Sequence, residues 1–65
     1  MSLSDKEIYH SARAVMAQYG EGAMTHARER LAALRAAEDD LGVAAWSRIA
    51  AAIEALQNQE PDLTH

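Results

Sequence analysis

Residues 4–20 read SDKEIYHSARAVMAQYG and contain the clearest helix signals in the chain. Their first four residues match a capping box, in which the Ser4 side chain bonds the backbone N–H of Glu7 and the Glu7 side chain bonds back to Ser4. Leu3 and Ile8 flank this box at the positions of the hydrophobic staple that often accompanies it. We therefore expect a helix to begin at about residue 5.

Apolar residues inside this stretch recur every three or four positions, as they do on one face of a helix. They are Ile8, Ala12, Val15, Met16 and Tyr19. Gly20 follows where a glycine commonly ends a helix, because glycine enters the left-handed region without strain. The first predicted helix therefore covers residues 5–19.

A second periodic segment follows the short hinge at residues 20–22. Its apolar residues repeat at the spacing of a coiled-coil seam; they are Met24, Ala27, Leu31, Leu34 and Leu41. We expect a helix over residues 22–37 that stops near Glu38, Asp39 and Asp40. Either aspartate could cap the next helix, because a carboxylate accepts hydrogen bonds from the free N–H groups at a helix start.

A third stripe, made of Trp46, Ile49, Ile53 and Leu56, predicts a helix over residues 40–57. The polar run from Gln57 and the proline at 61 are expected to end it, with a disordered tail over residues 58–65. Gly42 favours a break before this helix, although Leu41 and Val43 would also permit one continuous rod in a swapped dimer. The sequence therefore predicts a small, all-α, three-helix domain.

The composition predicts that this domain associates into a helical dimer. At 65 residues the chain is near the size at which a single core is only marginally stabilising. It has no cysteine and no phenylalanine, and Trp46 is its only tryptophan, so its core is thin and no disulfide supports it. The apolar stripes supply the expected interface, which consists of Tyr19, Met24, Leu31, Leu34, Trp46, Ile49, Ile53 and Leu56. For Trp46 the first interpretation is an anchor of the subunit's own core, and the interface is the alternative.

The net charge of −4 argues against a general nucleic-acid binder, because phosphate neutralisation requires a clustered excess of lysine and arginine. No apolar run is long enough to span a membrane, and Asp5, Lys6 and Glu7 stand where a signal peptide would be hydrophobic. We therefore expect a cytoplasmic protein that has no membrane contact and whose partner is a second copy or another protein.

Two pairs of residues suggest metal chemistry. Glu7 and His10 are three residues apart, the spacing used in helical di-iron sites, and His26 and Glu29 repeat that spacing in reverse order. Both pairs lie away from the apolar seams on a helical wheel, so we interpret them as surface residues. The alternative is a metal-binding or enzymatic site assembled across subunits around these four side chains.

Nucleophilic catalysis has only weak candidates in this chain. Ser11, Thr25 and Ser47 each lie inside a predicted helix without a nucleophile elbow or an evident base. The glycines at 20 and 22 do not form a phosphate loop, since no Gly-Lys-Ser/Thr follows them. We therefore assign no catalytic residue and no cofactor.

Three arginines, Arg28, Arg30 and Arg35, form the main cationic cluster. Arg28 and Arg35 flank the second seam, where ion pairs between helices commonly form. Their candidate partners are Glu38, Asp39, Asp40 and Glu54. The other interpretation is a docking patch for an acidic peptide or an anionic ligand.

These patterns favour a non-catalytic, homo-oligomeric interaction module over the cross-subunit site. A further alternative is a helix-turn-helix regulator, because three short helices suit that motif. The acidic balance counts against it, as does Arg48, which is the only basic residue of the third segment, whereas a recognition helix normally presents several cations.

One set of residues along the chain also resembles a known group of proteins. The set comprises Tyr9, Gly20, Ala23, Ala27, Arg30, Leu34, the Asp40-x-Gly42 turn, Trp46-Ser47-Arg48-Ile49 and Ala52-Ile53-x-x-Leu56. Over residues 8–57 this pattern resembles short helical proteins of unknown function from alphaproteobacteria. The resemblance implies a bacterial, cytoplasmic setting, and it brings no catalytic residues.

Overall fold

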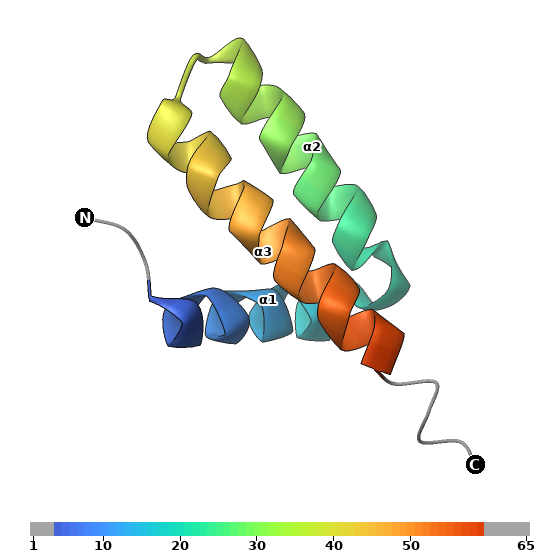
Figure 1. Ribbon diagram of the computed structural model, residues 1–65. Helices are drawn as coiled ribbons and strands as arrows, with labels where there is room; N and C mark the ends of the chain where they lie inside the picture. Colours follow the sequence, from blue (N-terminus) through green and yellow to red (C-terminus); the bar gives the residue numbers. More distant parts are fainter. Residues whose placement is uncertain (1–3, 60–65) are drawn as a thin grey trace.

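Three α-helical segments and one short 3-10 turn follow one another along the chain (Figure 1). The computed structural model describes residues 4–59. Helix α1 covers Asp5–Tyr19, the 3-10 turn η1 covers Gly20–Gly22, α2 covers Ala23–Ala36 and α3 covers Asp40–Gln59. The chain is thus an all-α, compact domain.

The turn η1 joins α1 directly to α2, so helical structure continues without a break from residue 5 to residue 36. Counted in this way, the chain has two helices: one long, bent helix made of α1, η1 and α2, and a second helix, α3. The prediction of three separate helices is therefore wrong. The bend comes from Gly20, whose φ of 56° and ψ of −125° lie in a region that only glycine enters readily. Gly20 therefore redirects the helix without ending it.

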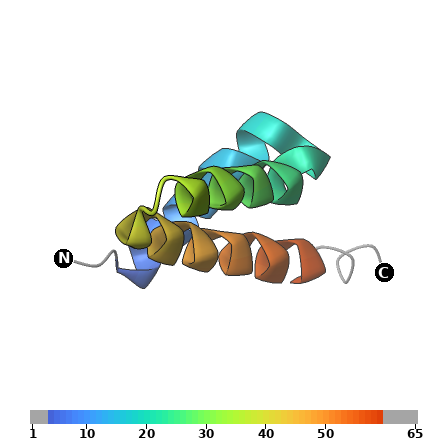
Figure 2. The same cartoon turned by 90° about the horizontal axis from the view of Figure 1, so that it is seen from above.

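Helices α2 and α3 run antiparallel as a hairpin, and α1 crosses this hairpin (Figures 1 and 2). The crossing lies toward the end of the hairpin where α2 begins and α3 ends. The other end, which carries the turn between α2 and α3, extends beyond α1. One half of the hairpin is therefore covered by α1, and the other half is not.

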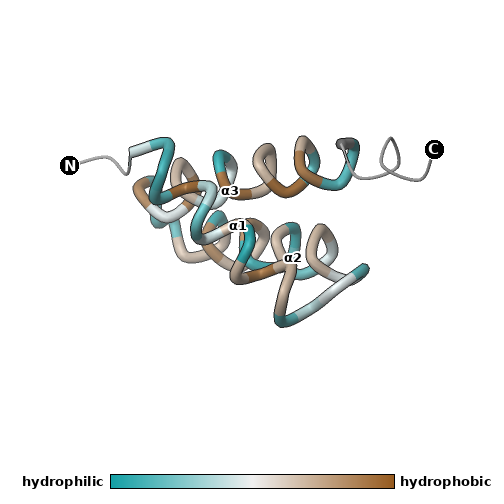
Figure 3. The backbone as a smooth tube through the Cα atoms, turned by 90° about the horizontal axis from the view of Figure 1, so that it is seen from below, coloured by the Kyte–Doolittle hydropathy of each residue, from teal (hydrophilic) through white to brown (hydrophobic). Residues whose placement is uncertain are grey.

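The core lies where α1 meets the hairpin, and Figure 3 shows apolar residues on all three helices. Its buried members are Ile8, Ala12, Ala23, Ala27, Ile49, Ala52 and Ile53. Ile53 is the only large side chain that is fully buried among the described residues, because alanines fill most of the remaining positions. Alanine favours helix and allows helices to approach closely, but it buries little apolar area. The core is consequently small.

The start of α1 confirms the predicted capping box. The Ser4 side-chain oxygen accepts a hydrogen bond from the Glu7 N–H at 3.3 Å, and the Ser4 N–H donates to Glu7 Oε1 at 3.0 Å. Leu3, the other half of the predicted staple, lies outside the described residues.

The turn between α2 and α3 is held by the pair of backbone bonds known as the Schellman motif. The N–H of Glu38 donates to the carbonyl of Arg35 at 3.0 Å, and the N–H of Asp39 donates to that of Leu34 at 2.9 Å. Glu38 has a φ of 58°, although this position usually holds glycine. The Asp39 carboxylate then accepts from the Gly42 N–H at 3.0 Å, so Asp39 rather than Asp40 caps α3.

The predicted helix bounds agree with the structure to within two residues. Residues 5–19 coincide with α1, and α2 is one residue shorter at each end than the predicted 22–37. Helix α3 extends to residue 59, so Asn58 and Gln59 are helical rather than part of a disordered tail. Glutamine is a good helix former and asparagine is tolerated, so the polar run itself does not end the helix. Residues 60–65, the remainder of the predicted tail, lie outside the described residues.

Candidate functional site

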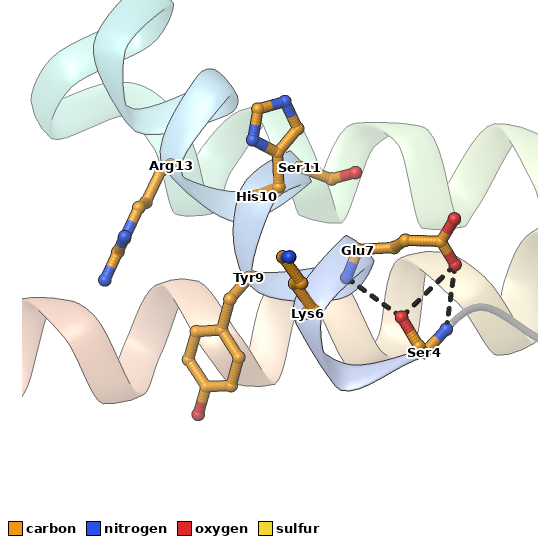
Figure 4. A pocket seen from close by; sticks show the side chains of 7 residues that line it. All are labelled: Ser4, Lys6, Glu7, Tyr9, His10, Ser11 and Arg13. Carbon is orange, nitrogen blue, oxygen red and sulfur yellow. Dashed lines mark hydrogen bonds between the residues drawn. The ribbon is translucent and has the colours of Figure 1, made fainter.

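A shallow hollow lies on the outer side of α1 (Figure 4). It is lined by Ser4, Lys6, Glu7, Tyr9, His10, Ser11 and Arg13. All of these belong to α1 or to its N-cap, so no second helix forms an opposing wall. Such a surface exposes a bound molecule to water, whereas ligand sites usually enclose most of their ligand.

The Glu7–His10 pair lies in this hollow, but Glu7 is already engaged. Its carboxylate accepts the Ser4 N–H, and Figure 4 shows it lying over Ser4 while the His10 ring points elsewhere. Both side chains are exposed. Within residues 4–59 no group of three or more histidine, aspartate or glutamate side chains is placed to hold a metal ion.

The two residues of the other predicted metal pair, His26 and Glu29, have different surroundings. Glu29 is exposed, as expected, but the expectation of a solvated His26 is wrong because His26 is half-buried. Its ring stacks on Tyr19 with centroids 4.0 Å apart and an interplanar angle of 14°. Its other neighbour is Trp46, whose ring lies edge-on at 5.7 Å. The bend at η1 produces this arrangement, because it returns the end of α1 toward α2.

Arg30 completes the aromatic cluster, which we define as Tyr19, His26, Arg30 and Trp46. The Arg30 Cζ lies 5.7 Å from the centroid of the Trp46 ring, within the range of a cation–π contact. Trp46 is half-buried and also packs against the core, which agrees with its interpretation as a core anchor. The aromatic cluster thus ties the end of α1 to α2 and α3 and stabilises the bend.

An ion pair lies at the other end of α1. Asp5, the first residue of α1, accepts a hydrogen bond from Arg48 in the middle of α3, with 2.7 Å between Asp5 Oδ1 and an Arg48 guanidinium nitrogen. The Asp5 side chain is 92% exposed, so the pair is screened by water and is expected to add little stability. The pair marks the position along α3 at which α1 begins to cover that helix.

Leu41 lies on the same side of α3 as Arg48, but beyond the reach of α1. Helical spacing aligns Leu41, Ala45, Arg48, Ala52 and Leu56 in one stripe. Ala52 is buried and Arg48 pairs with α1, so this stripe faces α1. Leu41 precedes Arg48 by about two helical turns and is 82% exposed, the highest value among the large exposed apolar side chains in the described chain. The apolar face that α1 covers therefore continues past the start of α1.

We call this uncovered end of the hairpin the distal surface and define it by Leu34, Leu41 and Ala45 with the charged residues Glu38 and Asp40 of the turn. Leu34 is half-buried against Gly42, since a Cβ added at Gly42 would lie only 2.7 Å from Leu34 Cδ2. Glu38 and Asp40 are both exposed. In the described part of the chain, none of their side chains takes part in a hydrogen bond or ion pair.

The residues predicted to form an interface are mostly used inside the subunit. Leu31, Ile49 and Ile53 are buried there. Met24, Leu34, Trp46 and Leu56 are half-buried, and Tyr19 is exposed on one side but stacks on His26. Sequence reasoning placed Leu41 in the second seam but did not include it in the interface. Its exposure depends on where α1 begins relative to α3, and no local pattern reports this.

The hydroxyl groups considered for catalysis all lie within helices. Ser11 is half-buried, whereas Thr25 and Ser47 are exposed. Across residues 4–59, no hydrogen bond joins any of the three side chains to a histidine or a carboxylate. Their geometry gives no support to a nucleophilic role.

Comparison with family models, curated proteins and solved structures gives no match to this chain. The resemblance to short alphaproteobacterial proteins therefore rests on the sequence pattern alone. Within the described residues, no helix has both the length and the apolar character needed to cross a membrane.

Proposed function

We propose that the chain is a non-catalytic interaction module that binds a second copy of itself through the distal surface, most simply as a homodimer. The observation that carries this proposal is Leu41, which is 82% exposed on an apolar face that α1 covers elsewhere. A second copy would cover that face as α1 covers the other half of the hairpin.

The small core supports the same proposal. Four of its buried residues are alanines, namely Ala12, Ala23, Ala27 and Ala52. A domain of this size has little stability to spare. Association that favours the folded state adds to that stability by mass action, so the melting temperature should rise with protein concentration.

The expected affinity is modest. Full burial of a leucine side chain contributes about 1.5–3 kcal/mol, so the two copies of Leu41 contribute about 3–6 kcal/mol. Association itself costs about 4–15 kcal/mol in lost motion, so the half-buried Leu34 and the alanines nearby must contribute as well. We therefore expect a Kd of about 1 μM or weaker, which corresponds to about −8 kcal/mol.

Sedimentation equilibrium over a wide concentration range tests the proposal, using the wild-type chain, Leu41→Ser and the matched control Tyr9→Ser. Tyr9 is 41% exposed on α1, outside the distal surface. We expect the wild type and Tyr9→Ser to form dimers and Leu41→Ser to stay monomeric with its helix content unchanged. A wild-type chain that is monomeric at every concentration would overturn the proposal.

A further inference from the structure

The bend between α1 and α2 depends on the backbone of one residue. Within residues 5–36, Gly20 is the only residue with a positive φ. Tyr19 and Gly22 are already close to helical, with φ and ψ of −109° and −8° and of −85° and 6°. The Gly20 N–H donates to the Met16 carbonyl, as it would in an unbent helix. Rotation of Gly20 into the right-handed region, with small adjustments beside it, therefore gives one straight helix over residues 5–36.

The apolar residues of α1 and α2 stay in register across this bend. Successive members are three or four positions apart, which places them on one face of a straight helix. They are Ile8, Ala12, Met16, Tyr19, Ala23 and Ala27. All but Met16 and Tyr19 are buried in the bent chain. The sequence therefore encodes one continuous apolar face, although the bend separates its two halves.

We infer that Gly20 is a hinge through which two copies of the chain exchange α1. In the exchanged dimer each chain forms a straight helix over residues 5–36, and its α1 covers the hairpin of the other chain. A straight helix carries the start of α1 about 27 Å beyond the start of α2. Helix α3, with 20 residues against 14 in α2, cannot follow it that far. The partner's hairpin has the same sequence, so it offers α1 the contacts that its own hairpin did.

Exchange of α1 goes beyond association through the distal surface. It uses the face of the hairpin that α1 already covers, whereas Leu41 lies outside that face (Figure 1). The stack of Tyr19 on His26 opposes exchange, because these residues lie about 10 Å apart along a straight helix. Glycine at position 20 also permits the bend without strain. The bent monomer is therefore favoured in dilute protein, and exchange increases with concentration.

Gly20→Ala tests the hinge, with Gly22→Ala as the matched control. Alanine is strained at a φ of 56° but favours helix over glycine, so Gly20→Ala favours the straight form, whereas Gly22 already has a negative φ. The strain changes the equilibrium by about tenfold or more for each chain, and thus by about a hundredfold or more for a dimer with two hinges. Both variants also carry Leu41→Ser, so that the distal surface does not contribute.

Cross-linking identifies exchange directly, because the chain has no cysteine of its own. One chain carries Asp5→Cys and a second carries Arg48→Cys, at the positions of the pair that joins α1 to α3. The two chains are unfolded together, refolded at high concentration, diluted and treated with a short bismaleimide. A linked dimer on a denaturing gel then reports that α1 of one chain lies on α3 of the other. We expect this dimer with Gly20→Ala and much less of it with Gly22→Ala.

The inference is overturned if Gly20→Ala refolds as a monomer at every concentration, or gives no more linked dimer than Gly22→Ala. If Gly20→Ala does not fold, Tyr19→Ala decides the question, because it removes the stack on His26 and keeps the glycine. It should favour exchange by about two- to tenfold for each hinge relative to the wild-type hinge. An unchanged yield of linked dimer would then overturn the inference. These results leave the proposed function untouched, since Leu41→Ser is present throughout.

Discussion

Replacing Glu38 with glycine should stabilise the fold, because Glu38 has left-handed backbone geometry. Its φ of 58° is imposed by the two Schellman bonds, in which Glu38 and Asp39 donate to the carbonyls of Arg35 and Leu34. A residue with a Cβ is strained there because the Cβ approaches the following carbonyl oxygen. Glycine lacks that atom and keeps the same backbone bonds.

The size of the effect follows from two opposing contributions. Removal of the left-handed strain is worth about 1–2 kcal/mol. Glycine also loses more backbone freedom on folding, which costs about 0.5–1 kcal/mol. The net gain in the free energy of unfolding for Glu38→Gly should be about 0.5–1 kcal/mol, and in a domain of this size 1 kcal/mol raises the Tm by roughly 4–8 °C.

Urea denaturation followed by circular dichroism measures this gain, with Glu38→Ala as the control. Both substitutions remove the same charge, but alanine keeps the Cβ and therefore the strain. Protein should be dilute, so that dimer formation does not contribute to either value. If Glu38→Gly proved no more stable than Glu38→Ala, the backbone at this position would not be strained by a Cβ.

Three further substitutions test other parts of the fold by the same unfolding measurement. Ile53→Ala should destabilise by about 2–5 kcal/mol because Ile53 is fully buried, and a loss below 1 kcal/mol would contradict its place in the core. Gly20→Ala should cost about 1–3 kcal/mol, because Gly20 has a positive φ. Gly22 has an ordinary φ of −85° and open space around it, so Gly22→Ala should be neutral or stabilising, and equal effects of the two substitutions would argue against the bend at Gly20. Asp39→Ala should lose about 1 kcal/mol with its helix cap, and an unchanged stability would show that the bond to Gly42 contributes little.

The parts of the fold that the sequence predicts well are those encoded by neighbouring residues. The capping box of Ser4 and Glu7 fixes the start of α1, Gly20 marks the bend that follows it, and periodic apolar residues identify the other helices. The turn after α2 was harder to predict in detail. No glycine marks its left-handed position, which Glu38 occupies, so the Schellman motif leaves no local trace.

Features that depend on contacts between distant residues could not be predicted in this way. A helical wheel places His26 in solvent because the wheel takes no account of the bend that brings Tyr19 over its ring. Leu41 belongs to a predicted seam, but the seam does not predict that it is exposed. Leu41 is exposed because α1 starts opposite Arg48, which lies seven residues further along α3. The candidate surface therefore follows from how α1 lies on the hairpin, and its residues were only partly among those expected.

Association of two copies through the distal surface can be detected residue by residue from amide chemical shifts recorded while ¹⁵N-labelled protein is diluted. Shifts that change with concentration identify the residues whose surroundings change when copies separate. We predict that these changes centre on Leu41 and extend over the end of α2 and the start of α3, while the outer face of α1 around Tyr9 and His10 stays constant. Shifts that do not change at any concentration, or that change mainly on α1, would contradict this association.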